Sequence, residues 1–339
     1  ALRVYSQNVN GFRLDRKGGD FAEFCQAMIE VQADVFAVTE HNLDTNKYHI
    51  KGCLHDVMRS DSAWVAYRLA TSTSTTASEY NYKPGGTLVA TVGDVTARVK
   101  DTGGDDMGRW SYVLMTGKNN LTIATVSAYQ VIDNNISRAG AKTAYAQQWA
   151  KQRETETIPN PRKQFRIDLI RQLREWKLQG IDILLTGDFN EVLGTDPAGL
   201  SKIATEFLLT DIMAMRHGLD EEVSSYARGD KRLDYMLASP RIAAAVLKCG
   251  MEPFNHRMYS DHRAMHADFD MDILFGNKPA VMAGLPYRDI RSKDAVSNTK
   301  YIQELHRILQ QRAAFTRMKT LLDNPKHANA ERLDQDIGK

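Results

Sequence analysis

The sequence has few cysteines and no long apolar segment. Its 339 residues include only Cys25, Cys53 and Cys249. Three widely separated cysteines fit neither a disulfide framework nor a zinc-binding spacing, so we expect them to pack as small apolar side chains in a reducing, intracellular compartment. No run of about 18 apolar residues occurs, so no membrane-spanning helix is expected, and no signal peptide is recognisable. Because the chain begins at Ala1, directly in a strand-like run, we expect a processed or excised piece of a longer protein.

A strong excess of one charge sign is also absent, but the charges are unevenly distributed. The formal net charge is +2 at pH 7. Residues 271–339 hold 12 basic and 8 acidic side chains. Residues 138–177 hold 10 basic and 4 acidic side chains. Charge alone favours a solvated helix face for such a segment. The alternative is a surface that contacts a polyanion, and its candidate side chains in the second segment are Arg138, Lys142, Arg162, Lys163 and Arg166.

Short apolar runs that end at polar residues recur along residues 1–275. They alternate with stretches of helical spacing, and this mixture predicts a single α/β sandwich domain. The predicted strands are residues 2–9, 33–40, 64–69, 86–92, 95–99, 110–116, 121–129, 181–189 and 232–238. The predicted helices are residues 21–31, two pieces of 139–178 separated near Pro159 and Pro161, 201–217 and 240–247.

The sequence changes in character after residue 275. Turn-forming residues indicate a linker there, at Gly276, Pro279, Gly284 and Pro286. Residues 300–322 then place an apolar stripe along a basic helix. Residues 276–339 are therefore predicted to be a linker followed by a basic amphipathic helical tail. Such a helix could pack on the domain, bind a partner or lead toward a further domain.

Polar side chains stand at or just past the ends of several apolar runs. In chain order they are Asn8, Asn10, Glu40, Tyr129, Asp188, Asn190, Asp234, Asp261 and His262. Side chains two residues apart on a strand share one face, so Asp188 is expected to lie beside Asn190. Neighbouring strands that end at one edge of the fold could bring the whole set into one cleft.

The residue types in this set favour metal-assisted phosphoester hydrolysis. Glu40, Asn8 and Asp261 offer oxygen ligands and no thiolate. Oxygen ligands suit a hard cation such as Mg²⁺, with Mn²⁺ as the alternative ion. Asp188 would orient or deprotonate a water molecule, and Asn190 would hold that water or donate to a phosphate oxygen.

The remaining groups supply hydrogen-bond donors. His262, held by the Asp234 carboxylate, would donate to the phosphorus centre where charge develops, and Tyr129 would add a further donor. Each residue also has a structural interpretation. Tyr129 could be a core tyrosine, Asp234 could pair with Arg232, and Asp261 could cap a turn. All of these structural interpretations would have to hold together to remove the catalytic one.

The motifs QNVNG, TEHN, SAYQ, GDFN, RLDY and SDH occur in this order between residues 7 and 262. Together they resemble the endonuclease/exonuclease/phosphatase superfamily. The resemblance implies a deoxyribonuclease I-like two-sheet α/β sandwich with one active site at its rim, and the predicted tail would be a C-terminal helical extension of this domain. It implies that Glu40 is the main metal ligand, with Asn8 and Asp261 nearby, and that Asp188 acts on water. It further implies that Asn190 and His262 act on the phosphate, that Asp234 orients His262, and that Tyr129 lies near the scissile bond.

Within the superfamily, GGTLVA (85–90) and GRWSYV (108–113) look most like endonuclease domains of non-LTR retrotransposons. That similarity implies nicking of nuclear DNA to leave a 3′-hydroxyl, and a tail that leads toward a reverse transcriptase. Asn10 stands where apurinic endonucleases carry a second acidic ligand, which weakens an abasic-site role. VIDNN (131–135) replaces the usual Pro-Asn pair. The alternatives are a phosphatase or sphingomyelinase-like phosphohydrolase of this fold, or an inactive nucleic-acid-binding module.

Overall fold

The computed structural model describes residues 1–15, 18–60, 64–76, 82–132, 143–154, 157–218, 223–276 and 295–323. The chain divides into two compact units, residues 1–283 and 284–339, and each is considered by itself. Within the described segments, none of the helices combines the length and the apolar character that crossing a bilayer requires.

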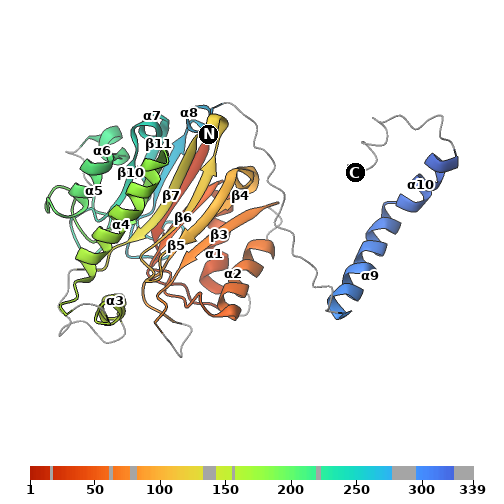
Figure 1. The fold of residues 1–339 in the computed structure, drawn as a ribbon, viewed down its shortest axis with the longest axis horizontal. Coiled ribbons are helices and arrows are strands. Elements are labelled where there is room, and N and C mark those ends of the chain that lie inside the picture. Colours follow the sequence, from red (N-terminus) through yellow and green to blue (C-terminus); the bar gives the residue numbers. More distant parts are fainter. Residues whose placement is uncertain are drawn as a thin grey trace. The chain divides into compact units, whose positions relative to one another are not determined.

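The first unit is built on two six-stranded sheets (Figure 1). One sheet has the order β11-β12-β1-β2-β4-β3, and the other has the order β5-β6-β7-β8-β10-β9. Each sheet contains one parallel pair, β1 with β2 and β7 with β8, among antiparallel neighbours. The strands of the first sheet are β1 (Leu2–Asn8), β2 (Val35–Thr39), β3 (Tyr67–Ser72), β4 (Thr87–Val92), β11 (Val246–Met251) and β12 (Met265–Phe269). The strands of the second are β5 (Val99–Gly104), β6 (Trp110–Thr116), β7 (Thr122–Tyr129), β8 (Ile181–Asp188), β9 (Thr210–Asp211) and β10 (Asp234–Ala238).

Helices cover the outer faces of both sheets (Figure 1). The helices of this unit are α1 (Gly19–Glu30), α2 (Tyr48–Ser60), α3 (Ala144–Gln152), α4 (Pro161–Leu178), α5 (Leu200–Phe207), α6 (Ile212–His217), α7 (Pro240–Ala244) and α8 (Met271–Phe275). Helices α1 and α2 share an apolar cluster with the first sheet, and α4 and α5 share one with the second. The predicted α/β sandwich is therefore confirmed, with both sheets enclosed between helical layers.

Strand periodicity explains why the central strands read as continuous apolar runs. In β2, Val35 and Ala37 enter the core between the sheets, whereas Phe36 and Val38 pack against the helices. In β8, Leu184 enters the core between the sheets and Leu185 faces α4 and α5. A strand that is buried on both faces has no solvent-facing position for a polar residue until it ends. The first polar side chains therefore appear at the rim.

Some element predictions were wrong. Residues 93–98 form a 3₁₀ helix rather than the first part of a strand, and β5 begins only at Val99. Val95 and Val99 both reach the core, and a spacing of four residues suits a helical turn as well as a strand. The predicted helix 201–217 is interrupted after Leu208, whose φ of 55° is left-handed and ends α5. Helix α2 was not predicted.

The second unit contains α9 (Ala295–Gln311) and α10 (Ala314–Asp323). A single helix over residues 300–322 was expected, but the helix breaks at Ala313, which has a left-handed φ of 50°. The rings of His306 and Phe315 lie 6.3 Å apart across this break. The predicted linker falls largely in residues 277–294, which lie outside the described segments.

Helix α4 gives a direct test of the packing. Phe165 is 1% exposed and meets Trp110 edge-to-face at 6.1 Å, whereas Ile167 in the same helix is 47% exposed. We expect Phe165→Ala to lower the free energy of unfolding by about 3–5 kcal/mol, because it leaves a cavity against the sheet. Ile167→Ala should change it by less than about 0.5 kcal/mol. Urea denaturation measures both, and equal losses would contradict the described face of α4.

Candidate active site

The polar residues at the strand ends meet at one rim of the sandwich. Asn8 ends β1, Tyr129 ends β7, Asp188 ends β8 and Asp234 begins β10. In the second sheet, Asp188 lies in register with Tyr129 on one side and with Asp234 on the other. The Asn8 side chain of the first sheet donates to the Asp188 carboxylate across the interface at 2.9 Å. Both sheets therefore contribute to one site.

Glu40 is held by two donors at the end of β2. Its Oε2 accepts from the Asn8 amide at 2.8 Å, and its Oε1 accepts from the Tyr129 hydroxyl at 2.5 Å. The Glu40 backbone has a left-handed φ of 53°, which is uncommon for a non-glycine residue. Such a conformation persists where the surroundings fix it, and it turns this side chain toward the site. Glu40 remains partly exposed, whereas Asn8 and Tyr129 are buried.

The GDFN stretch forms a tight turn behind the catalytic position. The backbone N–H of Asn190 donates to Asp188 Oδ1 at 2.9 Å, and the Asn190 side chain donates to Asp188 Oδ2 at 3.1 Å. Asn190 also donates to the Gln130 carbonyl at 2.9 Å. A Cβ on Gly187 would lie 1.9 Å from the Ala128 carbonyl oxygen, so only glycine permits this close approach of β7 and β8.

His262 and Asp234 form a buried pair beside Asp188. The His262 Nδ1 atom lies 2.8 Å from the Asp234 carboxylate, and its Nε2 lies 3.9 Å from Asp188 Oδ2. The Ser260 hydroxyl accepts from the His262 backbone N–H at 3.0 Å and donates to the Asn8 carbonyl at 2.6 Å. The imidazole is therefore oriented with Nε2 toward the Asp188 side of the site.

Burial and crowding of carboxylates shift the protonation of these groups. Burial raises the pKa of Asp188 to about 8, and the Asp234 and Glu40 charges act in the same direction against the opposing effect of His262. Burial works to lower the pKa of His262, but the charge and hydrogen bond of Asp234, together with the Asp188 charge, raise it to about 10. Burial, with the neighbouring Glu40 and Asp188 charges, raises the pKa of Tyr129 well above its usual range. The site therefore retains protons more strongly than isolated side chains would.

The donor set of this site fits a hard divalent cation. Asp188, Asp234 and His262 offer ligating atoms within 4.8 Å of one another. Because Asp234 already binds His262 Nδ1, we interpret these two as a hydrogen-bonded pair. Glu40 is the more accessible carboxylate, and its oxygen atoms suit Mg²⁺ or Mn²⁺. A bound cation would also offset the repulsion between the buried carboxylates. The metal-binding roles of Glu40, Asn8 and Asp261 remain predictions.

The other predicted residues lie farther from this network. The Asp261 carboxylate lies 3.9 Å from the Arg228 guanidinium, at the edge of the site, and it helps to raise the pKa of His262. Asn10 is exposed and donates its backbone N–H to the Asn8 side chain at 2.9 Å. Lys163 is exposed at the start of α4, and Arg166 pairs with Asp196 at 2.7 Å. Arg138 and Lys142 lie outside the described segments, as do positions 133–135 of VIDNN.

The expectation that Arg162 contacts a DNA backbone needs correction. This side chain is buried, and its guanidinium donates to the Val131 carbonyl at 2.7 Å and to the Asn190 carbonyl at 3.2 Å. It also pairs with the Glu191 carboxylate at 3.2 Å. Arg162 is therefore a support for the turn that carries Asn190. Likewise Arg232 pairs with Asp211, which leaves Asp234 to His262.

Several supporting residues were not predicted. Gln130 donates to the Phe189 carbonyl at 2.6 Å, beneath the turn of Asp188 and Asn190. The Ser225 hydroxyl accepts from the Asp234 backbone N–H at 3.1 Å. Ser260 links His262 to Asn8, as described above. Gln130 and Ser260 reach partners that are distant in sequence, Phe189 and Asn8, and Ser225 stands nine residues before Asp234 without a periodic pattern that marks it.

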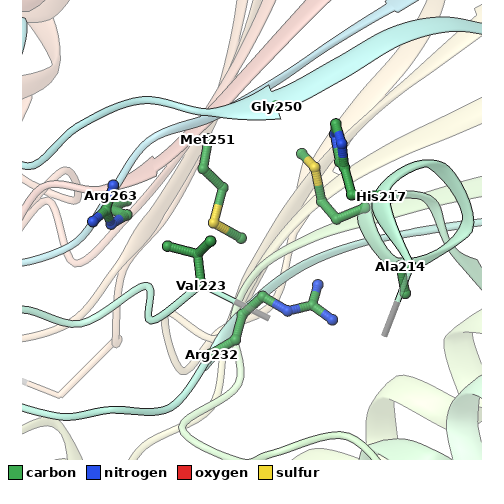
Figure 2. A pocket seen from close by; sticks show the side chains of 9 residues that line it. Ala214, His217, Val223, Arg232, Gly250, Met251 and Arg263 are labelled. Atoms are coloured by element: carbon green, nitrogen blue, oxygen red, sulfur yellow. The ribbon is translucent and has the colours of Figure 1, made fainter. Parts of the chain in front are cut away.

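A separate cavity of about 300 Å³ lies between α6, the end of β11 and Arg263 (Figure 2). Among the described residues, the nine that line it carry no carboxylate, and its Arg232 is already paired with Asp211. The lining includes Met213, Val223 and Met251, and Figure 2 shows the Met251 side chain directed toward Val223. The strand-end rim, where described carboxylates, amides and a histidine meet, is therefore the better candidate for phosphoester chemistry.

Two facing mixed sheets whose rim carries carboxylates, amides and a histidine are typical of phosphodiesterases with an α/β sandwich fold. The sequence profile of the Endonuclease/Exonuclease/phosphatase family matches residues 5–262, and this chain belongs to that family. The members of the family are hydrolytic nucleases or phosphatases. No curated protein matches the sequence significantly.

Solved structures with the same fold include nucleic-acid enzymes. The AP endonuclease LMAP from Leishmania major is 15% identical, with a TM-score of 0.57, over 78% of this chain and 86% of that one. An AP endonuclease from Archaeoglobus fulgidus is 16% identical, with a TM-score of 0.53, over 80% of this chain and 100% of that one. The 3′ phosphatase NExo from Neisseria, bound to product DNA hairpin, is 16% identical, with a TM-score of 0.52, over 80% and 100%. At such identities the likeness shows the fold alone.

The raised pKa of Asp188 predicts how the metal-free protein responds to pH. The Asp188 pKa is about 8 in the folded state, against about 3.9 in an unfolded chain, so folding becomes less favourable as pH rises between these values. Asp188→Asn removes this contribution. In EDTA, the variant should therefore gain stability relative to wild type between pH 5 and pH 8, on the order of 1 kcal/mol or more.

Denaturation curves at both pH values measure this difference. His262, whose pKa is about 10, adds stability that is lost between about pH 6.5 and pH 10, and the part of this loss that is due to Asp234 should persist in the variant. Asp94→Asn changes an exposed aspartate on the 3₁₀ helix and should keep the wild-type pH dependence. Parallel pH curves for wild type and Asp188→Asn would contradict the buried like-charge cluster.

Proposed function

We propose that this chain is a Mg²⁺-dependent DNA endonuclease that nicks target DNA and leaves a 3′-hydroxyl, as in integration of a non-LTR retrotransposon. The observation that carries the proposal is the continuous set of contacts that links Glu40, Asn8, Asp188 and Asn190 at one rim, with the His262–Asp234 pair alongside. Metal-assisted attack of water on a phosphodiester needs an oxygen-ligand site, a base for water and donors for the phosphate. This rim offers all three.

The residues divide into distinct roles in this scheme. Asp188 orients and deprotonates the attacking water, and a pKa of about 8 suits a base that works near neutral pH. Its orientation is fixed by donors from Asn8 and Asn190. The His262 Nε2 side donates to the phosphate as negative charge develops, because Asp234 favours the protonated ring. A divalent cation held by Glu40, Asn8 and Asp261 would withdraw charge from a phosphate oxygen.

Several observations favour DNA as the substrate. The similar solved structures include AP endonucleases and a 3′ phosphatase bound to product DNA hairpin. Lys163 lies exposed at the N-terminal end of α4, the helix whose Arg162 supports the Asn190 turn, and this exposure supports a contact with a DNA backbone near the site. The resemblance of residues 85–90 and 108–113 to retroelement endonucleases adds an expected reverse transcriptase partner and action on nuclear DNA.

Incubation with supercoiled plasmid tests the proposal. With Mg²⁺ we expect conversion to nicked circles whose ends a DNA polymerase extends, because the break leaves a 3′-hydroxyl. EDTA should abolish the reaction, and Asp188→Ala should slow it by about 10²-fold or more, since a positioned base acts in the transition state. Asp94→Ala, a change of an exposed aspartate, should nick like wild type.

Other outcomes point to other functions. Phosphate release from inositol phosphates or phosphocholine release from sphingomyelin, with an intact plasmid, would replace the proposal with a phosphohydrolase. DNA binding without any hydrolysis would indicate an inactive nucleic-acid-binding module. Nicking that persists in Asp188→Ala would belong to a contaminant.

A further inference from the structure

A groove of about 350 Å³ lies directly beside the catalytic rim, on the Glu40 side. Asn10 lines it and donates its backbone N–H to the Asn8 side chain. The Asn8 amide in turn donates to both Glu40 and Asp188. Two largely exposed tyrosines, Tyr82 and Tyr259, also line it; they are 58% and 84% exposed. We refer to this hollow as the tyrosine groove. Its volume falls within the range of about 300–1,000 Å³ typical of small-ligand sites.

The sheet topology places the two tyrosines on either side of the groove. In the order β12-β1-β2-β4, Tyr259 precedes β12 and Tyr82 precedes β4. The segment that leaves β1, residues 9–13, runs between them and lines the same groove. The groove is therefore lined by two aromatic side chains and by the segment that contains Asn10.

The backbone under Tyr82 is firmly anchored. Tyr82 forms a β-bridge with Leu43, and the next residue donates its backbone N–H to the Asn42 carbonyl at 2.9 Å. That residue, Lys83, is buried, and its ammonium lies 3.3 Å from the Asp44 carboxylate and 2.6 Å from the Ser74 carbonyl. This buried ion pair, one residue after the exposed Tyr82, fixes the backbone that carries the tyrosine ring.

Tyr259 is anchored through the catalytic framework. The following residue, Ser260, donates its hydroxyl to the Asn8 carbonyl. Its backbone N–H donates to the side-chain oxygen of Asn255 at 3.0 Å. Arg257 in the same segment pairs with Glu252 at 3.1 Å. Both tyrosines are therefore presented to solvent from fixed positions. Rigid aromatic side chains bind planar groups with little loss of conformational entropy.

The charges of the groove favour a neutral ligand over a phosphate. Among the residues that the structure describes, its lining contains two arginines, Arg13 and Arg257, and two acids, Asp20 and Glu23. Arg13 pairs with Asp20 at 3.1 Å, so its charge is already balanced. A phosphate would need an excess of positive charge, whereas a nucleobase is neutral, planar and rich in hydrogen-bonding groups.

We propose that the tyrosine groove binds an unpaired nucleobase of the substrate strand, next to the phosphate that is cleaved. Tyr82 and Tyr259 supply stacking surfaces, and Asn10 faces the polar edge of the base. This inference rests on the proposed DNA endonuclease function and adds a preference to it. A duplex hides its bases in the stack, so the enzyme should favour DNA that offers an unpaired nucleotide over fully paired DNA of the same sequence.

Equilibrium binding in EDTA tests this, because the DNA then stays intact. Fluorescence anisotropy compares a labelled duplex that carries a two-nucleotide bulge with its fully paired counterpart. Stacking on an aromatic side chain contributes about 1–3 kcal/mol per base, so wild type should prefer the bulged duplex by about 5-fold or more. Tyr82→Ala and Tyr259→Ala should each reduce this preference, whereas Tyr82→Phe and Tyr259→Phe should retain it.

The control variant is Tyr48→Ala, which removes an equally exposed tyrosine outside the groove and should keep the preference. Equal binding of the two duplexes by a wild type that nicks plasmid would overturn the groove proposal and leave the endonuclease function standing. So would a preference that survives both alanine changes. A protein that binds neither duplex and nicks no plasmid would remove both proposals together.

Discussion

The Asn8 amide makes the contact on which the site depends. It donates to Glu40 in its own sheet and to Asp188 in the facing sheet, at 2.8 and 2.9 Å. Two carboxylates that would otherwise repel one another across a buried interface are thereby held at defined positions by one neutral donor. The Tyr129 hydroxyl on Glu40 and the Asn190 donors on Asp188 complete the arrangement. Because these contacts cross between the sheets, the packing of the two sheets also fixes the geometry of the site.

That arrangement holds carboxylates close together, and a bound cation would relieve their repulsion. A buried acid with a raised pKa, here Asp188, beside a histidine held by a carboxylate is typical of catalytic sites rather than of structural ion pairs. The structural pairs of this protein look different. In Arg162–Glu191 and Lys83–Asp44, each acid has a permanent basic partner. Those pairs support the turns around the rim, whereas Asp188 has no comparable basic residue among its described contacts beyond His262, 3.9 Å away.

Much of the site could be predicted from sequence, because strand periodicity and strand ends are local signals. Asp188 and Asn190 were predicted to lie together from a spacing of two, and the structure brings them into contact. Arg162 was misplaced, although a signal existed. It stands three residues before Phe165 and seven before Leu169, on the stripe of α4 that enters the core. Gln130 and Ser260 could not be found from their contacts with Phe189 and Asn8, which are remote in sequence, and no periodic pattern marks Ser225, nine residues before Asp234. The left-handed backbone of Glu40 also leaves no trace in composition.

We propose that the oxygen ligands of the rim hold one divalent cation through Glu40. Titration of Mn²⁺ into metal-free protein, followed by the electron paramagnetic resonance signal of the free ion, tests it most directly. We predict one site that Mg²⁺ displaces and that Glu40→Gln weakens by about 10-fold or more, because a charged ligand is lost while the shape is kept. Unchanged Mn²⁺ affinity in Glu40→Gln would contradict a metal-binding role for Glu40.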